Sequence, residues 1–269
     1  MPDRSDVIYQ YDGSFEGLLC CVFESYELHE LPAGIAPIFA EQTSLYPTRI
    51  IQTDSQKAKR VLRSIPEKMG NEALRLVTRT FLTCMPQKEL DTLSFLRLGF
   101  RAGTTVTKML ADSTVDRIIK GVRYLENESN QYRQFTRFSE FSGILAGVIE
   151  PHNYVLPLIT QHFCERLPCE RFIIYDKTHG MALTHNQKGP SIVPIDGLRL
   201  PEPDEPEEKI HALWKLFYNT IEVPGRHNER CRMGHMPKRY WRYMTEFDNR
   251  KTFEDVMAEK EAEMPLLPE

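Results

Sequence analysis

The stretch FTRFSEFSGILAGVIE, residues 135–150, decides the fold that the sequence predicts. Residues 135–141 and 144–150 flank the pair Ser142-Gly143, and this arrangement predicts a β-hairpin. Residues 144–149 are apolar at successive positions, which is typical of a strand covered on both faces. The sequence therefore predicts a central strand here, with a sheet built around it.

The residues that follow extend this pattern. Residues 155–167 are predicted to form a helix, with Pro157 near its first turn. A second hairpin is predicted from 172–175 and 181–184, around a turn at 176–180. The order strand, strand, helix, strand, strand predicts an antiparallel sheet covered by helices.

The first half of the chain instead shows apolar residues at helical spacing. Short strand-like stretches occur only at 7–9 and 49–51, and 189–206 has the composition of a surface connection. Another helical stripe runs from Ile210 to Ile221. We therefore predict an α+β protein: a mainly helical region at 1–134, then at 135–269 a central antiparallel sheet of two hairpins with a helix between them, C-terminal helices and a basic, aromatic segment. The two regions could also form one continuous domain.

Composition places the chain among folded proteins. It has 269 residues, of which 41% are hydrophobic and 27% charged. It lacks an apolar run of about 18 residues and a signal-peptide pattern, so we expect no membrane span and a cytoplasmic location. Its six cysteines form neither a CxxC pair nor a CxxxCxxC motif, and nucleotide-binding glycine motifs are missing. The sequence thus predicts no metal and no cofactor.

A basic segment rich in aromatic residues, 226–243, stands out against a net charge of −4. Such a segment can grip phosphates and stack on bases. The alternative is that its rings anchor a C-terminal helix to the core. Since adjacent helical positions lie about 100° apart, we expect Trp241 to pack inward and Tyr240 to lie nearer a ligand. The phosphate-docking candidates are Arg226, Lys238, Arg239 and Arg242.

Three other residues are weak candidates for acid–base chemistry. Asp176, with His179 nearby, lies where the second hairpin turns, and Glu150 and His162 place a carboxylate and an imidazole near the predicted sheet. Aspartate is also an ordinary turn residue, and a histidine beside a sheet is commonly held by a structural hydrogen bond. Both interpretations stay open at this point.

Several blocks of the sequence resemble the bacterial "probable DNA metabolism protein" family. The N-terminal blocks are 11–19, Thr53-Asp54, Lys57-Ala58 and Arg60-Val61. The middle blocks are Arg137-Phe138, 149–151, His162-Phe163 with Arg166, and Tyr175-Asp176. The last blocks are Leu213-Trp214, Arg226 with Asn228, and 236–241. The resemblance spans nearly the whole chain in order.

The resemblance implies a DNA-binding accessory protein. The family is associated with a radical SAM protein thought to act in DNA modification or repair, and some members are fused to a domain like uracil-DNA glycosylase. It adds Arg137 and Asn228 to the nucleic-acid-binding candidates. The sequence departs from the family pattern at 128–131, where a Glu-x-His-Arg block is expected, and at 177–179, where a Lys-Arg pair is usual.

Three functions are therefore compared. The first is a DNA-binding accessory protein that prefers single-stranded or damaged DNA and acts with a radical SAM partner. The second is a DNA-processing enzyme, a nuclease or glycosylase, that uses Asp176, Glu150 and His162. The third is a protein–protein adaptor without nucleic-acid contact. A basic groove favours the first, a shared acid–base pocket the second, and an exposed apolar patch the third.

Overall fold

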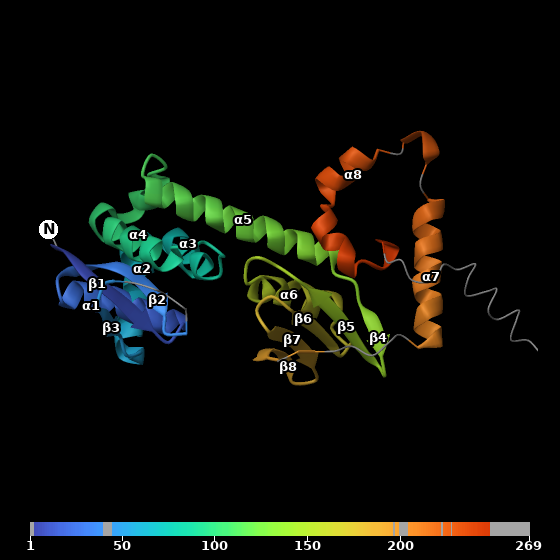
Figure 1. Ribbon diagram of the computed structural model, residues 1–269, viewed down its shortest axis with the longest axis horizontal. Coiled ribbons are helices and arrows are strands. Elements are labelled where there is room, and N and C mark those ends of the chain that lie inside the picture. Colours follow the sequence, from blue (N-terminus) through green and yellow to red (C-terminus); the bar gives the residue numbers. More distant parts are fainter. Residues whose placement is uncertain are drawn as a thin grey trace, which may run out of the picture. The chain divides into compact units, whose positions relative to one another are not determined.

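A computed structural model describes residues 3–39, 45–195, 197–198, 204–221, 223–226 and 228–247. The chain divides into two compact units, Met1–Glu126 and Asn127–Glu269 (Figure 1). The predicted boundary between residues 134 and 135 stays a prediction.

The first unit combines a small parallel sheet with helices. The sheet has the order β2-β1-β3, and its central strand buries Tyr9 and Tyr11. Helix α2 begins after Asp54, whose carboxylate accepts hydrogen bonds from the backbone N–H groups of Gln56 (2.7 Å) and Lys57 (3.2 Å). The elements are β1 (Asp3–Tyr11), α1 (Phe15–Glu27), β2 (Glu30–Pro37), β3 (Thr48–Ile50), α2 (Ser55–Met69), α3 (Asn71–Phe81), α4 (Lys88–Ala102), the 3-10 helix η1 (Gly103–Lys108) and most of α5 (Ser113–Phe135).

The second unit is built on a five-stranded sheet with the order β4-β5-β6-β7-β8. Three of its four strand pairs are antiparallel, and β5 pairs parallel with β6. This parallel pair arises because helix α6 connects the two strands, and such a crossover returns the chain in the same direction. The strands are β4 (Ser139–Phe141), β5 (Ile144–Ile149), β6 (Phe172–Asp176), β7 (Met181–Asn186) and β8 (Gly189–Pro194), and α6 spans Leu156–Arg166.

The predicted fold class is confirmed: helices dominate the N-terminal half, and both predicted hairpins, β4–β5 and β6–β7, are present with a helix between them. Two strands, β2 and β8, lie outside the strand-like stretches that the sequence predicts, and β8 falls within the predicted surface connection at 189–206. Strand β2 contains Pro32, and β8 contains Pro190 and Pro194. Both lie at the edge of a sheet, where a proline removes no inner hydrogen bond. Proline content therefore misled the prediction at these edges.

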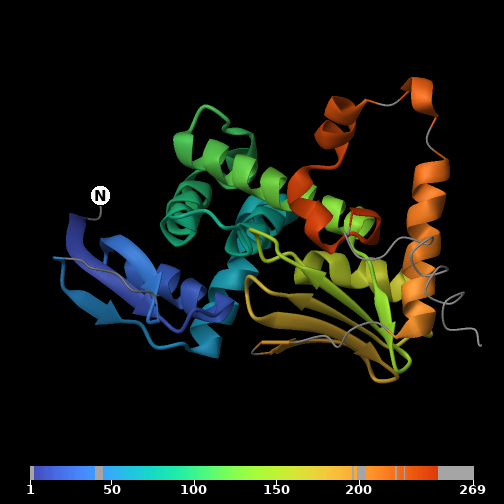
Figure 2. The same ribbon diagram turned by 45° about the vertical axis from the view of Figure 1, so that its right-hand side comes forward.

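Helix α6 lies across one face of the five-stranded sheet (Figure 2). Its buried side chains are Leu156, Ile159 and Phe163. The chain then continues through α7 (Glu205–Thr220), η2 (Pro224–Arg226), α8 (Glu229–His235), η3 (Lys238–Tyr243) and η4 (Thr245–Phe247). Within the described ranges, no helix has the length and apolarity that a membrane crossing requires.

Two helical glycines provide a test of the packing in the first unit. A Cβ at Gly99 would overlap the sulfur of Met69, which is 1% exposed, so alanine should overpack the core and destabilise it by about 1–3 kcal/mol. A Cβ at Gly121 would meet Met85, which is only partly buried and can move. Gly121→Ala should then gain up to about 1 kcal/mol of helix propensity. Thermal unfolding of both variants checks this, and a more stable Gly99→Ala would contradict the packing.

Candidate nucleic-acid interface

The predicted basic segment folds into short helices. Asn228 precedes α8, and its side chain accepts a hydrogen bond from the N–H of Cys231 at 2.9 Å. This is an N-cap, so the side-chain oxygen of Asn228 has a structural role. Arg226 and Lys238 are exposed, on η2 and at the start of η3. Arg242, on the same 3-10 helix η3, is exposed as well.

Tyr240 lies inside the unit, where we expected Trp241. Tyr240 is 4% exposed, and its ring packs edge-on against Tyr132 at 5.0 Å and beside Phe135 at 5.4 Å, both on α5. Its hydroxyl is hydrogen-bonded to Gln131. The expectation that Tyr240 lies nearer a ligand is therefore wrong, because these rings on α5 provide the apolar surface that buries it.

Trp241 is only partly buried, yet its ring is already engaged. It stacks on Phe247 with the ring centroids 4.2 Å apart and the planes 12° from parallel. Its indole N–H donates to the carbonyl of Met236 at 3.0 Å, and Lys238 lies 5.5 Å from its ring. These contacts hold η3, η4 and the end of α8 together, so a structural role accounts for this tryptophan.

The buried carboxylate of Glu128 fixes η3 to the rest of the unit. Glu128 is 1% exposed and accepts hydrogen bonds from the backbone N–H of His152 (3.1 Å) and from the backbone and side-chain N–H of Asn153 (2.8 and 2.7 Å). The guanidinium of Arg239 lies 3.3 Å from the same carboxylate. Arg239 thus neutralises a buried charge, and this contact competes with any phosphate.

Glu150 is a second carboxylate with basic partners, and it is partly exposed at the end of β5. It follows β5, and Asp176 ends the parallel neighbour β6, so both carboxylates lie at the carboxyl ends of adjacent strands. Glu150 is paired with Lys177 at 3.0 Å and with Arg242 at 3.1 Å. Burial by itself raises the pKa of Glu150. Hydrogen bonds from Lys177 and Tyr243 outweigh this effect and hold the pKa below its usual value. It is therefore an ion-pair partner that stays charged at neutral pH.

Asp176 is fully buried beneath the turn that follows β6. Its carboxylate accepts hydrogen bonds from the backbone N–H groups of Thr178 (3.0 Å) and His179 (3.1 Å), and it lies 2.7 Å from Nδ1 of His179. An aspartate that binds the N–H groups two and three residues later is characteristic of a turn. These contacts account for Asp176 structurally, and a catalytic role stays a prediction.

His162, the third acid–base candidate, is held in its neutral form. Burial, and then the charges of Arg133 and Arg166, lower the pKa of His162. Its Nε2 is buried without a hydrogen-bond partner. Within the part of the chain that the structure describes, no three His, Cys, Asp or Glu side chains gather in a group that could hold a metal ion.

A cavity of about 530 Å³ lies between the end of α5, strand β5, and helices α6 and α7. Its volume suits a small ligand. Among its lining residues, the family resemblance indicates Arg137 as a binding residue and includes Arg166 and Trp214 in its matching blocks. Arg133 was missed, although it lies four residues before Arg137. The cavity lining includes four charged side chains, an isoleucine and a tryptophan: Arg133, Arg137, Arg166, Glu207, Ile210 and Trp214.

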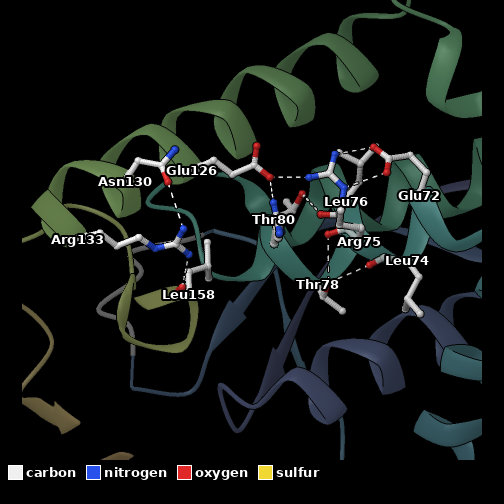
Figure 3. A network of polar contacts seen from close by, with 11 residues as sticks. Glu72, Leu74, Arg75, Leu76, Thr78, Thr80, Glu126, Asn130, Arg133 and Leu158 are labelled. Atoms are coloured by element: carbon white, nitrogen blue, oxygen red, sulfur yellow. Dashed lines mark hydrogen bonds and ion pairs between the residues drawn. The ribbon is translucent and has the colours of Figure 1, made fainter. Parts of the chain in front are cut away.

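The three arginines of this cavity differ in how well they are neutralised. Arg137 is paired at 2.7 Å with Glu246, whose side chain is 2% exposed. Arg133 donates to the carbonyl of Leu158 (2.5 Å) and to the side-chain oxygen of Asn130 (3.4 Å), both uncharged (Figure 3). Among the described residues, neither Arg133 nor Arg166 forms an ion pair with a carboxylate. The cavity is therefore lined by two guanidiniums that have no described carboxylate as an ion-pair partner, and the carboxylate of Glu207 lies on its α7 side.

The chain belongs to the family described as a domain of unknown function, DUF4130, whose model matches residues 86–246. The matched range runs from α4 into η4, and so includes Glu128 and every arginine that lines the cavity. A comparison with curated proteins found no match.

Glu128 and Glu150 form a matched pair for testing the attachment of η3. Glu128→Ala would leave the N–H groups of Asn153 and the charge of Arg239 without their buried acceptor, and should destabilise the second unit by about 3 kcal/mol. Glu150→Ala breaks ion pairs whose partners are largely exposed, and should cost less than about 1 kcal/mol. Denaturant unfolding measures both free energies. Equal losses would mean that Glu128 does not anchor the segment.

Proposed function

We propose that this protein is a DNA-binding accessory protein in DNA repair or modification, and that it acts with a radical SAM partner. We further propose that it binds single-stranded or damaged DNA through the cavity of its second unit. The observation that carries this proposal is the pair of guanidiniums without a described carboxylate partner, Arg133 and Arg166, in a cavity that also contains the partly exposed indole of Trp214.

The chemistry of this cavity suits a nucleotide. Guanidinium groups bind phosphate oxygens through charge-assisted hydrogen bonds, which are stronger than neutral ones. An indole ring offers a stacking surface that accepts any base, worth roughly 1–3 kcal/mol. Bases are available to such a ring only where the strand is unpaired, which is why we propose single-stranded or damaged DNA. The radical SAM partner and its role in repair are carried over from the family resemblance.

In this proposal, the basic residues predicted to bind phosphate on the C-terminal segment divide into two groups. Arg239 and Arg242 are ion-paired with Glu128 and Glu150 and serve chiefly to attach η3. Arg226 and Lys238 are exposed and could extend the contact along the strand. The base-binding role proposed for Tyr240 passes to Trp214, because Tyr240 is buried.

An adaptor function is the second candidate, and one observation favours it. Helix α7 exposes a row of large apolar side chains at helical spacing: Ile210 (58% exposed), Leu213 (50%), Phe217 (52%) and Ile221 (58%). Apolar side chains gathered in this way are common at protein interfaces. As an adaptor without nucleic-acid contact, the protein would bind a partner through this face of α7 and leave the cavity arginines unused.

The proposal predicts salt-dependent binding of single-stranded DNA. Each phosphate contact should contribute about −0.7 to the slope of log affinity against log salt. Arg166→Gln removes one such contact. It should therefore weaken the binding of a 20-residue thymidine strand and make the slope less steep by about 0.7. Arg171→Gln is the matched control, because Arg171 is also exposed in the second unit but donates to the carbonyl of Gly143 outside the cavity. Fluorescence anisotropy over a salt series measures both, and an identical effect of the two variants would contradict binding at the cavity.

A further inference from the structure

The cavity of the second unit has an uneven distribution of charge. Arg133 and Arg166 come from α5 and α6, whereas α7 contributes Glu207, Ile210 and Trp214. Glu207 lies 3.0 Å from His211, so its carboxylate is partnered within α7. An anion entering the cavity is attracted to the α5–α6 side and kept away from the α7 side by this carboxylate. The apolar ring of a ligand, conversely, finds its contacts on α7.

The α5–α6 side concentrates positive charge that no described carboxylate pairs with. Arg133 and Arg166 both line this side of the cavity, and burial together with their charges keeps the pKa of the neighbouring His162 low. His162 therefore adds no charge of its own at neutral pH. The Nε–H of Arg133 is buried without a hydrogen-bond partner. A buried donor without a partner costs folding free energy. If the Arg133 side chain rearranges on binding an oxyanion, this N–H can donate to the ligand and the cost is removed.

The number of charges indicates which phosphate fits. An internal phosphodiester carries one negative charge, whereas a terminal phosphomonoester carries about −1.5 to −2 at pH 7 and offers three strong acceptor oxygens. Two guanidiniums without described carboxylate partners can donate to more oxygens of the monoester than of the diester, and they face a larger negative charge on it. With a phosphate on the α5–α6 side, the attached nucleoside reaches toward Trp214 and Ile210 on α7.

We infer that the cavity binds the terminal phosphomonoester of a DNA strand, with the end nucleotide against Trp214. This inference rests on the proposed DNA binding and names the feature of the DNA that the cavity recognises. Either a 5′- or a 3′-phosphorylated end supplies the same chemistry. The protein would then bind at strand breaks and gaps, where such ends occur, in preference to continuous single strands.

The experiment compares three 12-residue strands of one sequence with the full chain: 5′-phosphorylated, 3′-phosphorylated and unphosphorylated. At least one phosphorylated strand should bind about tenfold or more tightly than the unphosphorylated strand, because charge-assisted hydrogen bonds are the stronger class. Thymidine monophosphate should displace the bound strand, and thymidine should not. The phosphorylated strand that binds more tightly identifies the end that is recognised.

Two variants in the cavity and one control variant outside it connect this preference to the cavity. Arg166→Gln should abolish the preference for the phosphorylated end, while Arg171→Gln, outside the cavity, should retain it. Ile210→Glu, at a position that is 58% exposed and so is expected to fold, adds a negative charge to the α7 side and should weaken binding of the phosphorylated strand. Unfolding curves confirm that each variant is native.

The outcomes separate the inference from the function on which it rests. Equal affinity for all three strands would overturn recognition of the end and leave DNA binding in place. Absence of binding to any strand would overturn both. A preference for the phosphorylated end that survives unchanged in Arg166→Gln would overturn the assignment to this cavity.

Discussion

The carboxylate of Glu128 is the contact on which the second unit depends. It accepts three hydrogen bonds from the loop after β5 and faces Arg239 on η3, so one buried charge joins the end of α5, the sheet and the C-terminal segment. A buried carboxylate is tolerated only when it is paired and hydrogen-bonded. This requirement explains why a segment that looks from its composition like a free basic surface is largely attached to the fold.

The need to pair buried carboxylates also determines which arginine side chains remain available to bind a ligand. Arg239, Arg242 and Arg137 each face a carboxylate, and the carboxylates of Glu128 and Glu246 are buried. Breaking such a pair to bind phosphate would leave an uncompensated charge inside the unit. Binding phosphate at Arg133 or Arg166 breaks no such ion pair. The described partners of Arg133 are uncharged, and no described carboxylate pairs with Arg166. Electrostatics therefore shifts the expected ligand contact from the C-terminal segment to the cavity between α5, α6 and α7.

The sequence predicted the elements better than the site. The Ser142-Gly143 turn and the apolar run at 144–149 correctly indicated the first hairpin, since turn chemistry and strand burial are local properties. The parallel pairing of β5 with β6, and the proline-containing edge strands, depend on tertiary contacts and could not be read in this way. The opposite burial of Tyr240 and Trp241 follows from the rings of Tyr132 and Phe135, more than a hundred residues earlier. Likewise, the partners of the arginines are carboxylates distant in sequence, so composition alone could not separate paired cations from free ones.

The central claim is that the cavity arginines, and not the paired arginines of the C-terminal segment, contact DNA. The most direct measurement follows the side-chain Nε–H resonances of arginine by NMR while a phosphorylated single strand is added to the ¹⁵N-labelled full chain. The account predicts that the resonances of Arg133 and Arg166 shift with increasing strand, while those of Arg239 and Arg242 stay in place. Movement of Arg239 and Arg242 with Arg133 and Arg166 unchanged would contradict it.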